Sequence, residues 1–197
     1  TGLDRLLGDT RVTAARLADG TELPADFVIA GVGIIAGTAL AEAAGLEIEN
    51  GIKTDEQGRT SDPHIWSAGD CASFPWKGGR LRLESVGNAI DQAETVAENI
   101  LGAGKPYEAK PWFWSDQYDC KLQIAGLNTG YDNIVTRGPE GESVSFWYFK
   151  GDTLLAVDAM NDPRAYMVGK RLIEQGKSPA KAALTNPATV MKDLLKA

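Results

Sequence analysis

Two adjacent residues, Gly69 and Asp70, have types and a position that could hold a ligand. They follow the apolar run His64–Ala68, which begins after a turn signal at Asp62-Pro63 and predicts a short buried strand. Ligands of open α/β sheets bind at the carboxyl ends of strands. We therefore expect Gly69 to let backbone approach a ligand and Asp70 to accept a hydrogen bond from a polyol hydroxyl. The alternative is that Asp70 merely caps a turn.

A helix is predicted just downstream, from about Glu84 to Leu101. Its apolar residues follow helical spacing, and Gly102 supplies the stop. A helix amino terminus carries unpaired N–H groups and about half a positive charge, which suits a ligand with negative charge. Read by itself, the segment could equally be an amphipathic surface helix.

Composition narrows the function classes. The 197 residues include 20 basic and 27 acidic side chains, a net charge of −7, which argues against a general nucleic-acid binder. No apolar run approaches the roughly 18 residues that cross a membrane, and the first residues lack the order of a secretory signal. Cys71 and Cys120 are too far apart for a redox or zinc pair and are expected to be small buried hydrophobes. Together these features predict a cytoplasmic protein.

The N-terminal third reads as short elements. Two β-prone runs, 11–17 and 22–29, flank the hairpin signal Asp19-Gly20. Gly31-x-Gly33 is rejected as a dinucleotide fingerprint because the following helical run, 38–44, is too short for a crossover helix. That run is expected to be a helix from Thr38 to Gly45, followed by short strands around Asn50-Gly51.

A glycine-containing loop is predicted over 76–83, with cations at Lys77, Arg80 and Arg82. It could be a solvated loop or a local positive field that attracts an acidic partner. His64, the only histidine, is expected to be a surface or packing residue, and we predict no metal ligand, nucleophile or general acid.

The C-terminal part follows a linker rich in Gly and Pro, 103–111, and opens with Trp112-Phe113-Trp114. Runs 133–137, 143–150 and 153–158 predict an antiparallel sheet. Three helices are then expected, each begun by a capping residue before proline, at Asp162-Pro163, Ser178-Pro179 and Asn186-Pro187.

Three motifs together carry a family resemblance. A threonine, a short apolar strand and Gly69-Asp70 resemble the second flavin-binding motif of two-dinucleotide-fold flavoproteins. "E-S-V-x-N-A-x-x-Q-A", beginning at Glu84, and "P-W-F-W-S-D-Q-Y-D-x-K-L-Q-x-A-G-L", beginning at Pro111, resemble ferredoxin reductases of bacterial oxygenase systems. The resemblance implies an α/β and α+β chain: the end of an NAD-binding domain (1–34), the closing part of an FAD-binding domain (35–107), and a C-terminal α+β domain (108–197) with an antiparallel sheet and helices.

The resemblance also implies site residues. Gly69 and Asp70 would meet the ribityl chain of FAD, and the helix start would face the pyrimidine edge of its ring system, stabilising the negative charge of reduced flavin near N1. Phe113 and Trp114 would pack near the ring. The helix-start residues concerned are Glu84, Ser85, Val86, Asn88 and Ala89.

Two functions are carried forward. In the first, the complete protein is an NAD(P)H:ferredoxin reductase that passes electrons through FAD to an iron–sulfur ferredoxin serving an oxygenase, with Lys77, Arg80 and Arg82 as a docking loop. No full G-x-G-x-x-G occurs, so the 197-residue chain alone is expected to be inactive and without tightly bound FAD. In the second, the chain is a non-enzymatic docking or dimerisation module. The choice between NADH and NADPH, the ferredoxin partner and the oligomeric state stay open.

Overall fold

The computed structural model describes residues 1–139 and 142–196, and its chain divides into two units, Thr1–Ile35 and Ala36–Ala197. The first unit is a three-stranded antiparallel sheet in the order β1-β2-β3, with strands Leu3–Leu7, Ala14–Leu17 and Glu22–Pro24. The predicted hairpin is confirmed, and Gly20 occupies its turn at φ +88°. Strand β1 was not predicted.

The run predicted to continue as a strand to Ile29 ends at Pro24. Among the described residues, no strand pairs with the segment that follows. The side chains of Phe27 and Ile29 are accordingly 75% and 86% exposed. An apolar sequence alone was therefore not enough to make a strand here, because a strand also needs a neighbour for its backbone hydrogen bonds.

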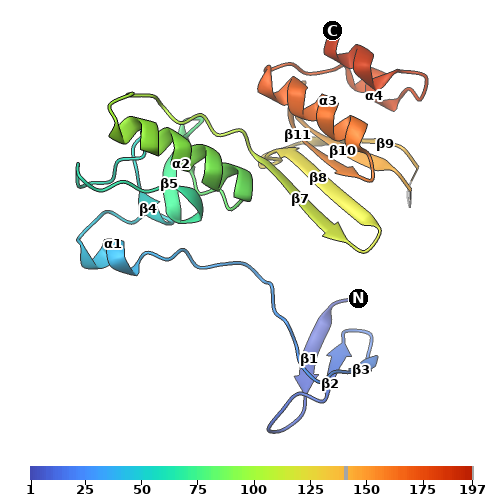
Figure 1. The fold of residues 1–197 in the computed structure, drawn as a ribbon. Coiled ribbons are helices and arrows are strands. Elements are labelled where there is room, and N and C mark those ends of the chain that lie inside the picture. Colours follow the sequence, from blue (N-terminus) through green and yellow to red (C-terminus); the bar gives the residue numbers. More distant parts are fainter. Residues whose placement is uncertain (140–141, 197) are drawn as a thin grey trace. The chain divides into compact units, whose positions relative to one another are not determined.

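The second unit begins with a small α/β region (Figure 1). Its sheet has the order β4-β5-β6, with β4 parallel and β6 antiparallel to the central strand. The predicted short helix is confirmed as α1, and the predicted long helix as α2. The bounds are α1 Ala39–Ala43, β4 Ile52–Lys53, β5 Ala72–Trp76, β6 Gly79–Leu81 and α2 Val86–Ile100.

Two predictions in this region are wrong. The loop predicted over 76–83 is the β5–β6 hairpin, because Lys77 and Gly78 both take positive φ, 46° and 79°, and form its tight turn. The strand predicted over 64–68 is absent: Trp66 makes an isolated bridge with Arg59, and neighbouring backbone groups bond back to the 58–60 segment.

The Gly-Asp pair consequently has a different context from the predicted one. Gly69–Cys71 forms one turn of 3-10 helix, and the buried strand β5 comes after it. Gly69 and Asp70 thus lie at the start of a strand, where the sequence analysis placed them at the end of one.

The C-terminal domain is a five-stranded antiparallel sheet in the order β7-β8-β11-β10-β9, as the sequence predicted in type (Figure 1). Helix α3 packs on one face, and the core between them includes the fully buried Trp147, Phe149 and Leu172. The bounds are β7 Trp112–Gln117, β8 Cys120–Gly126, β9 Asn133–Arg137, β10 Val144–Lys150, β11 Thr153–Met160, α3 Pro163–Glu174 and α4 Lys181–Thr185.

One of the three predicted helix starts is correct. Asp162 caps α3 by accepting a hydrogen bond from the N–H of Ala165 at 3.0 Å. Ser178 instead accepts from the N–H of Leu154 at 2.8 Å, and α4 begins later. Asn186 closes a local turn, and the last element is a 3-10 helix, Met191–Lys196. Capping residues also bond to distant or local backbone, so a cap signal does not guarantee a helix.

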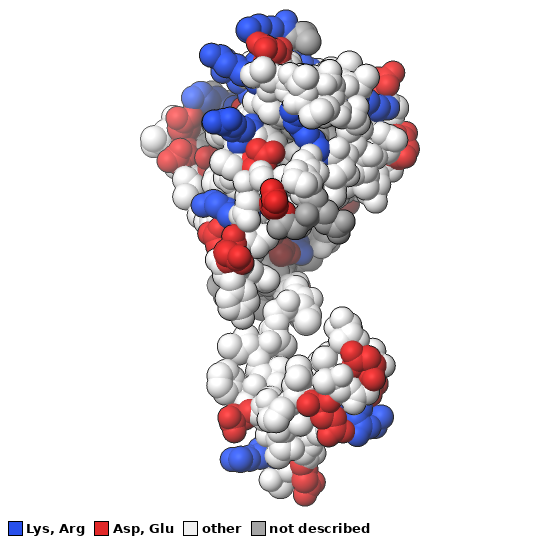
Figure 2. Space-filling model, turned by 90° about the vertical axis from the view of Figure 1, so that its right-hand side faces the viewer, with Lys and Arg blue, Asp and Glu red and all other residues white. Residues whose placement is uncertain are grey.

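Charge and hydrophobicity bear on the kinds of surface that the chain offers. Acidic and basic side chains are interspersed on the face that Figure 2 presents. Among the described residues, no helix combines the length and apolar character needed to span a membrane. Within the same residues, no group of three or more His, Cys, Asp and Glu side chains is placed to hold a metal ion.

Cys71 and Cys120 are both free and partly exposed, so the prediction that they are buried is wrong.

Candidate functional site

The amino terminus of α2 is fixed by its own side chains and by one from the linker that follows the helix. Ser85 caps the helix, its hydroxyl accepting from the N–H of Asn88 at 3.2 Å. The Asn88 amide donates to the carbonyl of Leu83 at 3.0 Å and accepts from the hydroxyl of Tyr107 at 2.9 Å. The first turn contains no acidic residue. The helix end therefore presents its partial positive charge from a rigid frame.

The Gly69-Asp70 turn packs directly on this helix. Gly69 is buried at φ +78°, and its N–H donates to the side chain of Gln92 at 2.8 Å. A Cβ added to Gly69 would lie 3.5 Å from the Cβ of Ala89. The turn and the first helical turn are thus adjacent, and Asp70, the next residue of the turn, is exposed.

A cavity of about 240 Å³ lies where the start of α2 meets the C-terminal domain. Of the predicted site residues, Glu84, Ser85 and Phe113 line it, together with Trp112 and Asp158. The other six do not line it: Gly69 and Ala89 contact each other as described, Asn88 is buried at the helix start, and Asp70, Val86 and Trp114 are exposed. A role of these nine residues in cofactor binding stays a prediction.

The half-buried carboxyl group of Asp158 lies in the wall of this cavity. Asp158 accepts a hydrogen bond from the hydroxyl of Tyr148 at 2.8 Å. Burial raises the pKa of Asp158 above its usual range, and burial together with that hydrogen bond raises the pKa of Tyr148 to about 12. Asp158 of this pair is one polar part of the cavity wall, and Glu84, Ser85 and Asn128 are the other polar lining residues.

The sequence analysis assigned no role to Trp112 and Gly87, which join the helix end to the C-terminal domain. The Trp112 indole stacks on Trp114 with ring centroids 5.3 Å apart, and the Lys170 ammonium lies 5.1 Å from its ring centroid. A Cβ on Gly87 would come within 2.5 Å of the indole nitrogen of Trp112. A glycine in the first turn of a helix, where alanine is intrinsically better, was the signal that could have shown this close approach.

The three cations of the predicted docking loop differ in how they are used. Arg80 donates to the carbonyls of Thr54 and Ser73, and Arg82 binds the Asp70 carbonyl and the Glu84 carboxylate. The Lys77 ammonium instead lies over the neighbouring Trp76 ring at 4.5 Å. The hairpin tip thus presents one of the three charges, and the other two serve internal contacts.

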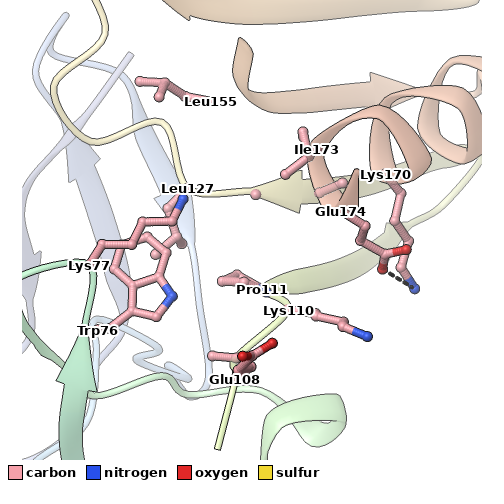
Figure 3. A pocket seen from close by; sticks show the side chains of 13 residues that line it. Trp76, Lys77, Glu108, Lys110, Pro111, Leu127, Leu155, Lys170, Ile173 and Glu174 are labelled. Atoms are coloured by element: carbon pink, nitrogen blue, oxygen red, sulfur yellow. Dashed lines mark ion pairs between the residues drawn. The ribbon is translucent and has the colours of Figure 1, made fainter. Parts of the chain in front are cut away.

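Lys77 also borders a second cavity, of about 180 Å³ (Figure 3). Its rim carries Lys77 from the hairpin, Lys110 from the linker and Lys170 from α3, the last in a loose 3.9 Å ion pair with Glu174. Apolar side chains, among them Leu155 and Ile173, form part of the wall. Three cations from segments distant in sequence therefore line one depression together with two acids, Glu108 and Glu174.

Comparison with known proteins assigns both parts of the chain. Residues 1–93 match the pyridine nucleotide-disulphide oxidoreductase family, and residues 112–195 match the reductase C-terminal family. The fold class is therefore that of a pyridine nucleotide-disulphide oxidoreductase, followed along the chain by a reductase C-terminal domain.

Relatives and solved structures narrow this class. The chain is 40% identical over 203 residues to putidaredoxin reductase of Pseudomonas putida, covering 100% of this chain and 47% of that protein. It is 41% identical over 183 residues to rhodocoxin reductase of Rhodococcus erythropolis, covering 90% and 43%. The ferredoxin reductase for the CYP199A2 system of Rhodopseudomonas palustris superposes with a TM-score of 0.88 at 40% identity, covering 97% and 48%. The covalent putidaredoxin reductase–putidaredoxin complex gives 0.89 at 40% identity, covering 100% and 48%.

Relatives that are 40% and 41% identical to this chain are thus putidaredoxin and rhodocoxin reductases, and the resemblance to ferredoxin reductases that the sequence motifs predicted is confirmed. It spans about half the length of the curated relatives it matches.

Proposed function

We propose that this chain is the part of an NAD(P)H-dependent ferredoxin reductase that faces the flavin ring and carries the C-terminal domain. The complete protein would take electrons from NAD(P)H and deliver them to an iron–sulfur ferredoxin that feeds an oxygenase. The observation that carries the proposal is the contact between the Gly69-Asp70 turn and the first turn of α2 at Ala89, beside a cavity lined by Ser85 and Phe113.

The residues present fit the ring and ribityl parts of FAD. A capped helix end without acidic residues in its first turn suits an electron-rich ring, and an exposed carboxylate at a tight turn suits a polyol. FAD would supply the conversion of two-electron hydride transfer into single-electron transfer. The protein's share is to bind, orient and tune it: Asp70 would hold the ribityl chain, the Ser85 cap would fix the helix end, and Phe113 would cover the ring.

The charges of the chain indicate where an acidic ferredoxin partner would bind. The chain carries −7 overall, so an acidic ferredoxin would have to be attracted by a local cluster of cations. Lys77 is the member of the predicted docking loop that can serve, because Arg80 and Arg82 are engaged internally. Lys110 and Lys170 on the rim of the same cavity would add to its field.

The test uses the full-length product of the gene that encodes this chain, purified beside the 197-residue chain. We expect stoichiometric flavin absorbance and NAD(P)H-driven reduction of an added [2Fe–2S] ferredoxin from the former, and neither from the latter. Asp70→Ala should weaken FAD binding, whereas Glu94→Ala, an exposed acid on α2, should not. A colourless full-length product that still binds the ferredoxin would overturn the proposal in favour of a docking module.

Location in the cytoplasm stays a prediction, to be tested by cell fractionation.

A further inference from the structure

We infer that Arg82 is a positioning residue, which clamps the Gly69-Asp70 turn to the segment leading into α2 and balances the charge of Glu84 there. The inference rests on the proposed function for its consequence in cofactor binding. The clamp itself is a property of the chain that can be measured without any cofactor.

The contacts of Arg82 join three separate loops. Its Nη1 donates to the carbonyl of Asp70 at 3.1 Å and lies 2.6 Å from a carboxylate oxygen of Glu84. Its Nε reaches the side-chain oxygen of Asn50 at 3.4 Å. The Arg82 side chain is only 12% exposed, whereas that of its partner Glu84 is 38% exposed. A guanidinium can serve several acceptors at once because its donors are fixed in a planar fork.

The stem of Arg82 occupies a slot that requires glycine opposite it. Gly51 has φ +119°, and a Cβ there would lie 2.8 Å from the Cδ of Arg82 and 2.7 Å from the carbonyl oxygen of Cys71. The 50–51 turn therefore presses the arginine stem against the backbone of the Gly69–Cys71 turn. This packing places the guanidinium before any ligand binds.

Charge gives the contact a second consequence. Glu84 immediately precedes the Ser85 cap, so its carboxylate lies near the helix end that is proposed to face the electron-rich ring. An unpaired carboxylate there would offset the half positive charge of the helix end. Arg82 neutralises it at 2.6 Å. Loss of Arg82 should therefore both loosen the Asp70 turn and lower the potential of a nearby flavin.

The first experiment is amide hydrogen exchange on the 197-residue chain. Loss of a charge-assisted hydrogen bond changes an equilibrium by about tenfold or more, so Arg82→Gln should raise exchange in peptides covering 69–72 by at least about tenfold. The matched control is Lys77→Gln, which removes one charge from the neighbouring β5–β6 hairpin and makes no contact with the Gly69–Cys71 turn. It should leave exchange in peptides 69–72 unchanged. Arg82→Lys, which keeps the charge but cannot span all three acceptors, should give an intermediate increase and serves if Arg82→Gln does not fold. Unchanged exchange in the arginine variants would overturn the clamp.

The second experiment measures the flavin in the full-length gene product. Arg82→Gln should weaken FAD binding about tenfold, the loss of one charge-assisted hydrogen bond, and shift the midpoint potential to a lower value. Adding Glu84→Gln should restore the potential while exchange at 69–72 stays fast, since charge balance is regained but the clamp is not. A potential that does not change in Arg82→Gln, or is not restored in the double variant, would overturn the charge-balancing role. If wild-type protein bound no FAD, the proposed function would fail, and the clamp would be judged by exchange alone.

Discussion

The contact between Gly87 and Trp112 predicts that Gly87→Ala will lower the stability of the chain when Trp112 is present and raise it when Trp112 is replaced by a smaller residue. Gly87 lies in the first turn of α2, and a Cβ there would come within 2.5 Å of Nε1, 2.8 Å of Cε2 and 3.0 Å of Cζ2 of Trp112. These are rigid ring atoms that cannot rotate away individually. We expect Gly87→Ala to destabilise the chain, although the same change stabilises most helices.

The magnitude follows from two opposing terms. Alanine is about 1 kcal/mol more favourable than glycine inside a helix, and overpacking a close contact costs about 1–3 kcal/mol. The free energy of unfolding should therefore fall by up to about 2 kcal/mol in the wild-type background. With Trp112→Leu the obstacle is gone, and Gly87→Ala should raise the free energy of unfolding by up to about 1 kcal/mol.

The assay is urea unfolding of the 197-residue chain and of the two single variants and the double variant, followed by circular dichroism. The double-mutant cycle should give a coupling of about 1–3 kcal/mol between the two sites, as expected for residues in direct contact. Equal effects of Gly87→Ala in both backgrounds would refute the reasoning, because they would mean that the helix end and the indole do not touch in solution.

Three further outcomes test other contacts. Asn99 is 3% exposed and makes three hydrogen bonds to main-chain groups, so Asn99→Ala should lower the free energy of unfolding by about 2–4 kcal/mol in urea titrations. Asp162→Ala removes the cap of α3 and should cost about 1 kcal/mol by the same measurement. The pKa of Asp158 is raised by burial, so the native state binds this proton more tightly than the unfolded state does, and stability is lost as pH rises from about 4 through the native pKa. Asp158→Asn should remove that loss, so the free energy of unfolding of wild type minus that of the variant should be more positive at low pH than at neutral pH.

The features that were predicted correctly are those determined by residues close together in the sequence. The start of α2 is encoded by Ser85 and its stop by Gly102, and three strands of the C-terminal sheet, β9, β10 and β11, by alternation and turn residues, whereas β7 and β8 were not predicted. The family motifs likewise cover contiguous stretches. Local chemistry was enough for these elements because their hydrogen bonds close within the element or with the next strand along the chain.

The wrong predictions concern segments whose structure depends on distant partners. The apolar runs 25–29 and 64–68 have strand composition but form no ladder with other described strands. Ser178 has the type and position of a cap, yet its hydroxyl bonds to the backbone at Leu154 across the fold. Propensity states what a segment can form, and the available neighbours decide whether it does so.

The same distinction explains why the positioning residues of the site were missed. Arg82 lies in a run of cations that could have been solvated or could have faced a partner, but two of its three acceptors come from residues 12 and 32 positions away. Trp112 was read as one of three aromatics, and its contact with Gly87 crosses the linker between two sheets. Both residues connect the helix end to another part of the fold, so a substitution at either should change the geometry of the site. Such substitutions should change exchange or stability in the chain before any ligand is added, whereas substitution of the exposed Asp70 should change ligand affinity alone.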